Sequence, residues 1–359
     1  MKHRLVLALV VLVLVSFSIL LRASNTPSAP ASAAETTTST SLRSLAQKRG
    51  ISMGVAVDFA ALQNDANYRS ILTREFDILV PENAWKFQYV HPTRHNYDFS
   101  QVDALMAFAK SNNMQMRGHP LAWHHLIPSW VEKGNFTRDE WMAILREHIQ
   151  TLMGRYRGQI PIWDVVNEAI NRDGSLRDTI WLRHIGPEYI DLAFRWAHEA
   201  DPQARLFYCD YGTEELGQKS DAVYDLVRGL LQRGVPVNGV GFQAHLGLSY
   251  APKLKPLAEN FQRLGELGLE VQFTELDVKV QDGTGSWEKR LAEQAKVYAG
   301  LLQTCLQAKS CTAFTTWGFT DRYSWIGDLT GLGEAPLLFD KSYRPKAAYK
   351  AIQQVLSSE

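Results

Sequence analysis

An alternation of short apolar runs with amphipathic segments along residues 42–359 most constrains the fold. Such alternation is typical of βα units, which place their strands side by side in a parallel sheet. No second linker or change of composition interrupts the pattern, so we expect a single domain over 42–359. The expected strands cover residues 53–57, 78–80, 114–118, 162–166, 205–208, 239–243, 270–274 and 313–316.

Eight such units in one stretch favour an α/β fold of the (β/α)8 TIM-barrel type. The alternative, an open doubly wound sheet, lacks its fingerprint, because no Gly-rich phosphate loop follows Gly54 in the first run. Two helices between the strands have readable starts. Ser100 with Asp103, and Thr137 with Glu140, form capping-box patterns ahead of apolar residues at helical spacing.

The first residues predict export. Basic residues at positions 2–4 precede an apolar run at 5–21, which is typical of a signal peptide or an uncleaved membrane anchor over 1–22. A Ser/Thr/Pro/Ala-rich tract at 23–41 cannot form a core and predicts a flexible, disordered tether. We therefore expect a secreted, periplasmic or membrane-anchored protein that touches a membrane only through this segment.

Charge and cysteine content exclude several classes of partner. The 38 basic and 38 acidic residues balance, so nothing indicates a nucleic-acid partner, and we expect a monomer. Cys305 and Cys311 could close a small loop in an oxidising compartment, whereas Cys209 lies in an apolar run and is interpreted as a buried, inert thiol. No Cys/His cluster has metal-ligand spacing, so we expect neither a metal nor a cofactor.

Polar and aromatic side chains follow seven of the eight expected strands. The carboxyl ends of barrel strands form one working face, so these side chains should line a single cleft. Many of the 10 Trp residues stand beside Gly, Asp, His or Asn, which favours stacking surfaces over core positions. The residues are Glu82, Asn83, Lys86, His119, Trp123, Asn167, Glu168, Tyr211, Gln243, His245, Glu275, Asp277, Trp317 and Trp325.

Two carboxyls stand out, because Glu168 and Glu275 each directly follow an apolar run, on the fourth and seventh strands. A carboxyl pair across a Trp-lined cleft is equipped to cleave a glycosidic bond, one as a protonated acid and one as an ionised nucleophile. His245 and Asp277 could hold Glu275 ionised, and Glu168, with no cation nearby in sequence, could be the acid. Spacing alone does not decide between retention and inversion.

Other interpretations compete for single residues. Asn167 and Glu168 could cap a helix, and each Glu could form a structural ion pair. Lys86 could be a Schiff-base amine, although Glu82 and Asn83 beside it favour binding of hydroxyl groups. His119 and His245 could be core histidines, but both follow strand ends beside amides and aromatic residues. We interpret His124, His125 and Asp191 as structural.

With these residues, the chain resembles family 10 glycoside hydrolases, the endo-β-1,4-xylanases, over nearly all of its length after the tether. The resemblance rests on eight ordered motifs. They are Pro-Glu-Asn-Ala-x-Lys at 81–86, Arg-Gly-His at 117–119 with Trp123-His124, Trp-Asp-Val-Val-Asn-Glu at 163–168, Asp-Gly-Ser-x-Arg at 173–177, Asp-Tyr at 210–211, Gly-x-Gly-Phe-Gln-x-His at 239–245, Thr-Glu-Leu-Asp at 274–277 and Trp-Gly-x-Thr-Asp-x-x-Ser-Trp at 317–325.

The resemblance implies a retaining double displacement on xylan or xylo-oligosaccharides. It makes Glu168 the acid/base, Glu275 the nucleophile, and His245 and Asp277 the partners of the nucleophile. It also implies a Cys305–Cys311 disulfide. The implied sugar-binding residues are Glu82, Asn83, Lys86, His119, Trp123, Gln243, Trp317 and Trp325 on the glycone side, Asn167 at the hydroxyl beside the reacting carbon, and Tyr211 on the aglycone side.

Three departures from the family pattern concern substrate contacts and not the chemistry. Leu126 stands at the Gln of Trp-His-x-Gln-x-Pro, Phe87 replaces a common Trp, and residues 209–212 replace Asn-Asp-Tyr-Asn with Cys-Asp-Tyr-Gly. They motivate a β-1,4-glucanase or another β-glycosidase as the alternative to a xylanase. A further alternative, from another class, is a non-catalytic sugar-binding barrel.

Overall fold

The computed structural model describes residues 40–330 and 334–358, which belong to one compact unit, Thr38–Glu359. The predicted signal or anchor at 1–22 lies outside the described residues, as does most of the predicted tether at 23–41. Within the described part of the chain, no helix is both long and apolar enough to cross a membrane.

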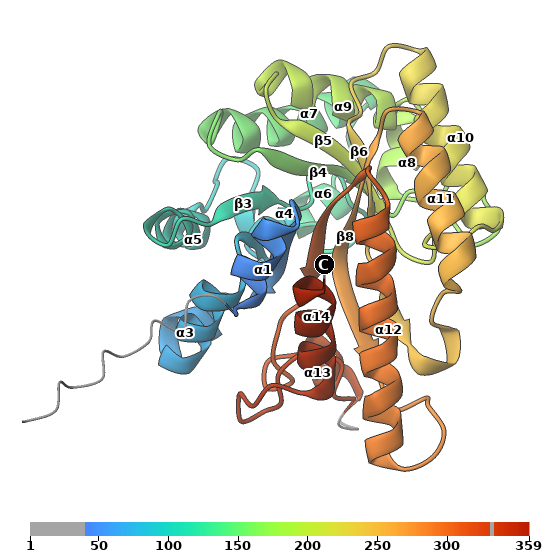
Figure 1. Ribbon diagram of the computed structural model, residues 1–359. Helices are drawn as coiled ribbons and strands as arrows, with labels where there is room; N and C mark the ends of the chain where they lie inside the picture. The colour runs from blue at the N-terminus through green and yellow to red at the C-terminus, as the bar shows by residue number, and fades with distance from the viewer. Residues whose placement is uncertain (1–39, 331–333, 359) are drawn as a thin grey trace, which may run out of the picture. The chain divides into compact units, whose positions relative to one another are not determined.

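Eight parallel strands close into a barrel, which confirms the (β/α)8 prediction (Figure 1). The ring runs from β1 to β6 and on through β8 and β9; β6 pairs with β8, and β9 pairs with β1. A short extra strand, β7, pairs with the distal end of β8. The strands are β1 (Ser52–Val57), β2 (Ile78–Pro81), β3 (Gln115–Gly118), β4 (Ile162–Asn167), β5 (Arg205–Asp210), β6 (Gly239–Phe242), β7 (His245–Gly247), β8 (Glu270–Lys279) and β9 (Cys311–Thr316).

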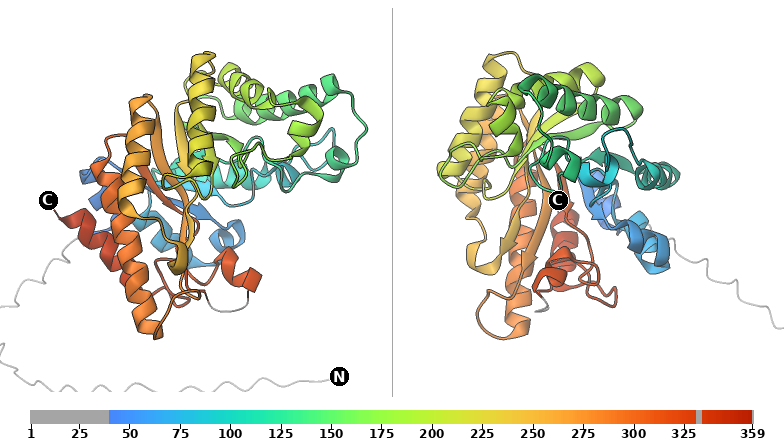
Figure 2. Two further views of the ribbon diagram at one scale, coloured as in Figure 1. Left: turned by 90° about the vertical axis from the view of Figure 1, so that its right-hand side faces the viewer. Right: turned by 180° about the vertical axis from the view of Figure 1, so that it is seen from behind.

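Helices lie outside the strands in the three views of Figures 1 and 2. The last helix, α14, packs against both α12 and α1, which brings the two ends of the described unit together. The helices are α1 (Leu42–Lys48), α2 (Phe59–Asn64), α3 (Ala66–Glu75), α4 (Phe87–Val90), α5 (Ser100–Ser111), α6 (Ser129–Glu132), α7 (Arg138–Arg155), α8 (Ile180–Ile185), α9 (Tyr189–Ala200), α10 (Gln218–Gln232), the 3-10 turn η1 (Leu248–Tyr250), α11 (Leu254–Glu266), α12 (Trp287–Gln307), α13 (Trp325–Thr330) and α14 (Ala347–Ser357).

One of the two predicted helix starts is confirmed and the other is wrong. Thr137 and Glu140 form the expected reciprocal capping box at the start of α7. Helix α5, in contrast, begins at Ser100 itself, and the preceding Phe99 makes no side-chain cap. The carboxylate of Asp98 instead accepts a hydrogen bond from the Ser100 amide at 2.9 Å, because an acidic side chain two residues earlier competes for the same donor.

Strands β4 and β8 run further than predicted, and both are irregular beside the predicted catalytic carboxyls. The register of β4 shifts between Asp164 and Val166, just before Glu168. Strand β8 does not end at Thr274, because its register against β9 shifts between Phe273 and Leu276 and the strand then continues beside β7. A β-bulge re-aims the side chains that follow it, so both irregularities set the direction of a carboxyl.

The expectation that Trp residues are mainly ligand surfaces is wrong for several of them. Trp85, Trp141, Trp163 and Trp181 are fully buried in the main hydrophobic core. Trp85 and Trp163 meet edge to face at 4.9 Å between ring centroids. A polar neighbour in sequence therefore does not indicate whether a Trp lies in the core or in a ligand site.

The cysteine predictions agree with the structure. Cys305 at the end of α12 and Cys311 at the start of β9 form a disulfide across six positions. Cys209 is free and fully buried in β5.

Candidate active site

Most of the predicted site residues lie around one cavity of about 440 Å³ at the carboxyl end of the barrel. Three tryptophans and the two predicted catalytic carboxyls share the wall of this space. The predicted residues in its wall are Lys86, His119, Trp123, Glu168, Tyr211, Gln243, His245, Glu275, Trp317 and Trp325, and His125 joins them without having been predicted.

The remaining predicted residues support the wall from behind. Asn167 accepts a hydrogen bond from Gln243 at 3.1 Å, and Asp277 contacts His245. Asn83 accepts a hydrogen bond from Lys86 at 2.9 Å, but its own side chain lines a neighbouring cavity of about 200 Å³. Glu82 lies close enough to Lys86 to affect its pKa.

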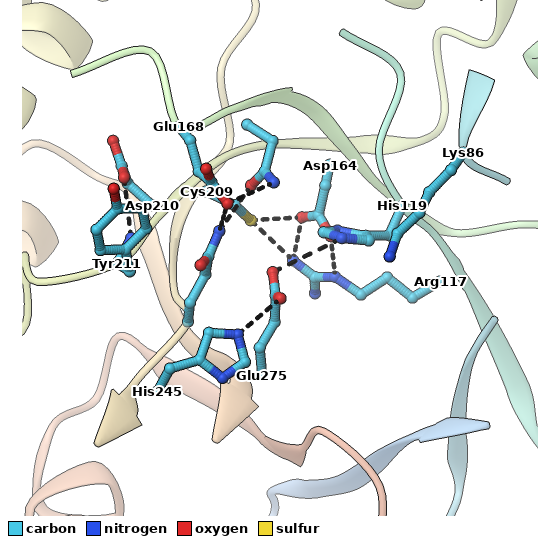
Figure 3. Close-up of polar contacts among 12 residues, drawn as sticks. Lys86, Arg117, His119, Asp164, Glu168, Cys209, Asp210, Tyr211, His245 and Glu275 are labelled. Carbon is cyan, nitrogen blue, oxygen red and sulfur yellow. Dashed lines mark hydrogen bonds and ion pairs between the residues drawn. The ribbon is translucent and has the colours of Figure 1, made fainter. Parts of the chain in front are cut away.

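Glu275 sits in a chain of hydrogen bonds that favours its ionised form (Figure 3). His245 lies 3.2 Å from Glu275 through Nε2 and 2.8 Å from Asp277 through Nδ1. Burial would raise the pKa of Glu275, but His119 and His245 outweigh it and lower that pKa. Burial likewise opposes the charged form of His245, yet the two carboxylates raise its pKa to about 10. Glu275 is therefore an anion at neutral pH, as a nucleophile must be.

A buried ion pair fixes His119 on the other side of Glu275. Arg117 donates to Asp164 through Nε at 2.8 Å, and the same carboxylate lies 3.0 Å from Nδ1 of His119. Nε2 of His119 then lies 3.7 Å from Glu275. Burial opposes the charge on Asp164, but Arg117 and His119 overcome it and hold its pKa below the usual range. The sequence motifs alone did not predict that the Arg117–Asp164 pair supports the nucleophile through His119.

Cys209 takes part in the same network. Its thiol donates to Asp164 at 2.7 Å, and burial raises its pKa well above the ordinary value. It therefore stays a neutral hydrogen-bond donor, consistent with the prediction of an unreactive thiol.

The backbone of Glu168 is in the left-handed region, with φ of +58°. Two hydrogen bonds hold it there: its amide donates to the Cys209 carbonyl at 2.9 Å, and its carbonyl accepts from Arg177 Nε at 2.8 Å. A non-Gly residue in this conformation is strained and persists only where the surroundings impose it, typically at functional sites. The side chain is set by Gln243, which donates to Oε1 at 3.1 Å.

His124 and His125, which we interpreted from the sequence as structural, both lie at the site. Nε2 of His124 lies 3.9 Å from Oε2 of Glu168, and His125 lines the cavity. Burial, together with His125 and Arg177, lowers the pKa of His124 to about 3, so this contact is not an ion pair near neutral pH. Asp191 does lie outside the site, where it pairs with Arg233 on the surface at 2.7 Å.

Aromatic rings in the cavity wall provide stacking faces. The ammonium of Lys86 lies 5.3 Å from the ring centroid of Trp123 and 5.9 Å from that of Trp317. Burial lowers the pKa of Lys86, opposed by Glu275, Glu82 and Glu168. Tyr211 is held by Arg177, which donates to its hydroxyl at 2.8 Å, and by Lys219, which lies 3.8 Å from its ring centroid.

Two of the family departures occupy left-handed backbone. Leu126 has φ of +52°, and its carbonyl accepts from the Gln88 amide at 2.8 Å; its side chain is not part of the cavity wall. Gly212 has φ of +65°, a region that Asn, the residue of the family pattern, also tolerates. The Asn-to-Gly difference thus preserves the backbone conformation at 212.

Replacing Gly212 by Val is expected to lower the free energy of unfolding by roughly 1–2 kcal/mol, because a β-branched side chain resists positive φ. Nothing lies within 4 Å of an added Cβ, so the cost comes from the backbone and not from a clash. Gly212→Asn is the matched control and should unfold close to the unchanged protein in thermal or urea denaturation. Equal stability of the Val and Asn variants would contradict this account.

Replacing His245 by Asn is expected to move the acid limb of the kcat/KM profile to higher pH. The charged imidazole lowers the pKa of Glu275, so its removal lets Glu275 take a proton at a higher pH and lose nucleophilicity. A hydrogen bond to a charged group is worth about 1.5–3 kcal/mol, which corresponds to roughly a ten- to hundredfold loss of kcat/KM. A loss of rate without a shift of the acid limb would assign His245 a purely structural role; His198→Asn on the outer face of α9 is the control.

Comparison with known proteins places this geometry in a family. The family model for glycosyl hydrolase family 10 matches residues 41–355. Endo-1,4-beta-xylanase B of Thermotoga neapolitana is 40% identical over 324 residues, covering 89% of this chain and 92% of the relative. Endo-1,4-beta-xylanase 1 of Humicola insolens is 38% identical over 89% of this chain and 75% of its own length.

Solved structures agree. Xylanase 10B of Thermotoga petrophila RKU-1, determined in complex with xylobiose, superposes with a TM-score of 0.85 at 41% identity, over 88% of this chain and 97% of that one. A closed parallel barrel, two opposed carboxyls and a family match over almost the whole described unit lead to one conclusion: the chain belongs to glycosyl hydrolase family 10.

Proposed function

We propose that this protein is a retaining endo-β-1,4-xylanase. The observation that carries the proposal is the pairing of Glu275, held ionised by His245 and Asp277, with Glu168 in the wall of the same Trp-lined cavity. The family and the xylanase names of its relatives support the substrate class.

In the first step, Glu275 attacks the anomeric carbon while Glu168 protonates the departing glycosidic oxygen, giving a covalent glycosyl-enzyme. In the second step, Glu168, now a carboxylate, removes a proton from water, and the water displaces Glu275 and restores both groups. Two inversions retain the anomeric configuration. Gln243 orients Glu168 throughout, because its amide donates to Oε1.

The aromatic wall fits a chain of flat pyranose rings. Trp317 and Trp325 lie near His245, with Trp325 also donating to Asp277 at 2.9 Å, and Tyr211 lies near Glu168 in the same wall. Sugar faces that stack on such rings gain apolar contact, whereas Lys86 and Gln243 offer hydrogen bonds to hydroxyls. Binding on both sides of the scissile bond supports endo action.

Product analysis on polymeric xylan, with the anomeric form followed by NMR, tests reaction class and stereochemistry together. We expect a rapid fall in chain length and initial release of β-anomers. Initial α-anomers would contradict retention, and carbohydrate binding without new reducing ends would favour the sugar-binding barrel.

A β-1,4-glucanase is the second candidate, and the departures at Leu126 and Gly212 motivate it. Initial rates on xylan and on carboxymethyl-cellulose, measured with the same preparation, separate the two. Faster release from carboxymethyl-cellulose would make the glucan the preferred substrate.

We further propose that the protein is exported and acts as a monomer. The basic and apolar residues at 2–21 and the Cys305–Cys311 disulfide support export. Cell fractionation with N-terminal sequencing of the product distinguishes a cleaved signal from an anchor, and light scattering gives the oligomeric state.

A further inference from the structure

Two adjacent histidines and the proposed acid/base form a compact cluster at the cavity. One nitrogen from each of His124 and His125 and one oxygen of Glu168 all lie within 4.8 Å of one another. The His124 and His125 ring centroids are 4.1 Å apart, and Nε2 of His124 points to Glu168 at 3.9 Å. Three groups that can each donate a lone pair therefore converge on one point in the cleft.

The imidazole of His124 is not fully hydrogen-bonded within the described residues. Its Nδ1 is buried without a hydrogen-bond partner in that part of the chain, and its Nε2 is beyond hydrogen-bond distance of Glu168. A buried polar atom left without a partner requires an explanation such as a bound ion or water. A cation between Nε2 and Glu168 would give that nitrogen and the carboxylate a shared partner, while the buried Nδ1 would carry the ring proton.

The donor set selects the kind of cation. Two imidazoles and one carboxylate suit borderline-soft divalent ions of the Zn²⁺ and Cu²⁺ type, whereas Ca²⁺ and Mg²⁺ prefer oxygen ligands. Ligands about 2.0–2.2 Å from a tetrahedral ion lie roughly 3.3–3.6 Å apart, so the cluster must contract by about 1 Å or slightly more. His125 can supply this movement because its side chain is exposed.

We propose that His124, His125 and Glu168 bind one Zn²⁺-type cation and that this cation inhibits the enzyme. The ion replaces the proton of Glu168, which passes to the solvent, and the coordinated carboxylate can neither protonate a leaving group nor activate water. A fourth coordination position remains open to water. The inhibitory part rests on the proposed function; the binding part does not.

The family pattern does not specify the second imidazole. The family pattern Trp-His-x-Gln-x-Pro includes His124 but leaves position 125 open, and here it holds a histidine beside the cavity. His125 is therefore the residue to change, because its exposed side chain is not needed for folding. His198, exposed on the outer face of α9, is the matched control.

Calorimetric titration of the full chain with ZnCl₂, after removal of metals with EDTA, tests the binding. We expect a binding event of one Zn²⁺ per chain that CaCl₂ does not reproduce. His125→Ala should weaken it by at least about tenfold, as expected when a ligand is lost, and His198→Ala should retain it. Absence of Zn²⁺ binding, or equal binding by the His125→Ala and His198→Ala variants, would overturn the proposal.

Xylan hydrolysis at increasing ZnCl₂, expressed relative to the metal-free rate of the same variant, tests inhibition. Half-inhibition should require at least about tenfold more Zn²⁺ in His125→Ala than in His198→Ala. Zn²⁺ binding by a protein that does not hydrolyse xylan would leave the metal site standing and defeat the proposed function. Hydrolysis that Zn²⁺ inhibits equally in both variants would defeat the inhibitory site alone.

Discussion

Replacement of Glu275 by Gln is expected to lower kcat on xylan by on the order of 10⁴-fold or more, since removal of a nucleophile disables the whole covalent route. The amide matches the carboxylate in shape and can still meet His245, so the fold should persist. It carries no charge with which to attack the anomeric carbon. Reducing-sugar release measures the loss, and circular dichroism checks that the variant is folded.

Glu270→Gln is the matched control for this variant. Glu270 lies on the same strand, β8, but at its opposite end, where it pairs with Arg205 at 2.7 Å on the surface. This partly exposed pair lies outside the cavity wall, so the control should keep its activity. Near-normal hydrolysis by Glu275→Gln would refute the assignment of the nucleophile.

Azide gives a stereochemical check on the same residue. In Glu275→Ala, azide can enter the vacated space and attack an aryl β-xylobioside that has a good leaving group. A single displacement inverts the anomeric carbon, so the product should be the α-xylobiosyl azide. A β-azide would mean that another group had formed the covalent intermediate.

The alternation of apolar runs was sufficient to predict the barrel, because parallel strands buried on both faces leave a strong signal in sequence. Polar residues at the strand ends likewise identified the cleft, since the fold itself brings those ends together. Phe207 and Tyr208, for example, are fully buried in β5, as an apolar run predicts. Such patterns predict which residues form a strand and which of them are buried.

The same patterns do not predict local departures from regular strand geometry. The register shift in β8 places Glu275 within a strand that was expected to end before it. The left-handed backbone of Glu168 depends on a hydrogen bond from Arg177, nine residues away in sequence. The position of His124 beside Glu168 was not predicted for a similar reason, because it depends on how the loop after β3 folds. Such features arise from tertiary hydrogen bonds and not from residue spacing.

Replacement of Glu168 by Ala is expected to give a loss that depends on the leaving group. General acid catalysis contributes about 10²- to 10⁴-fold to the rate. We expect kcat/KM on xylan to fall by that amount, because an unprotonated sugar alkoxide is a poor leaving group. A dinitrophenyl xylobioside needs no proton to depart, so its kcat/KM should change little. Removal of the base slows the second step, so the glycosyl-enzyme accumulates and KM falls together with kcat.

Azide then separates the two carboxyls, because in Glu168→Ala it attacks the intermediate already formed on Glu275. This second inversion should yield the β-xylobiosyl azide, the anomer opposite to the product expected from Glu275→Ala, and it should restore turnover of the aryl substrate. Glu199→Ala is the control, since Glu199 pairs with Arg146 at 3.0 Å on the helical surface and should not alter either substrate. An equal loss on xylan and on the aryl substrate would mean that Glu168 is not the proton donor, and an α-azide would mean that the two roles are exchanged.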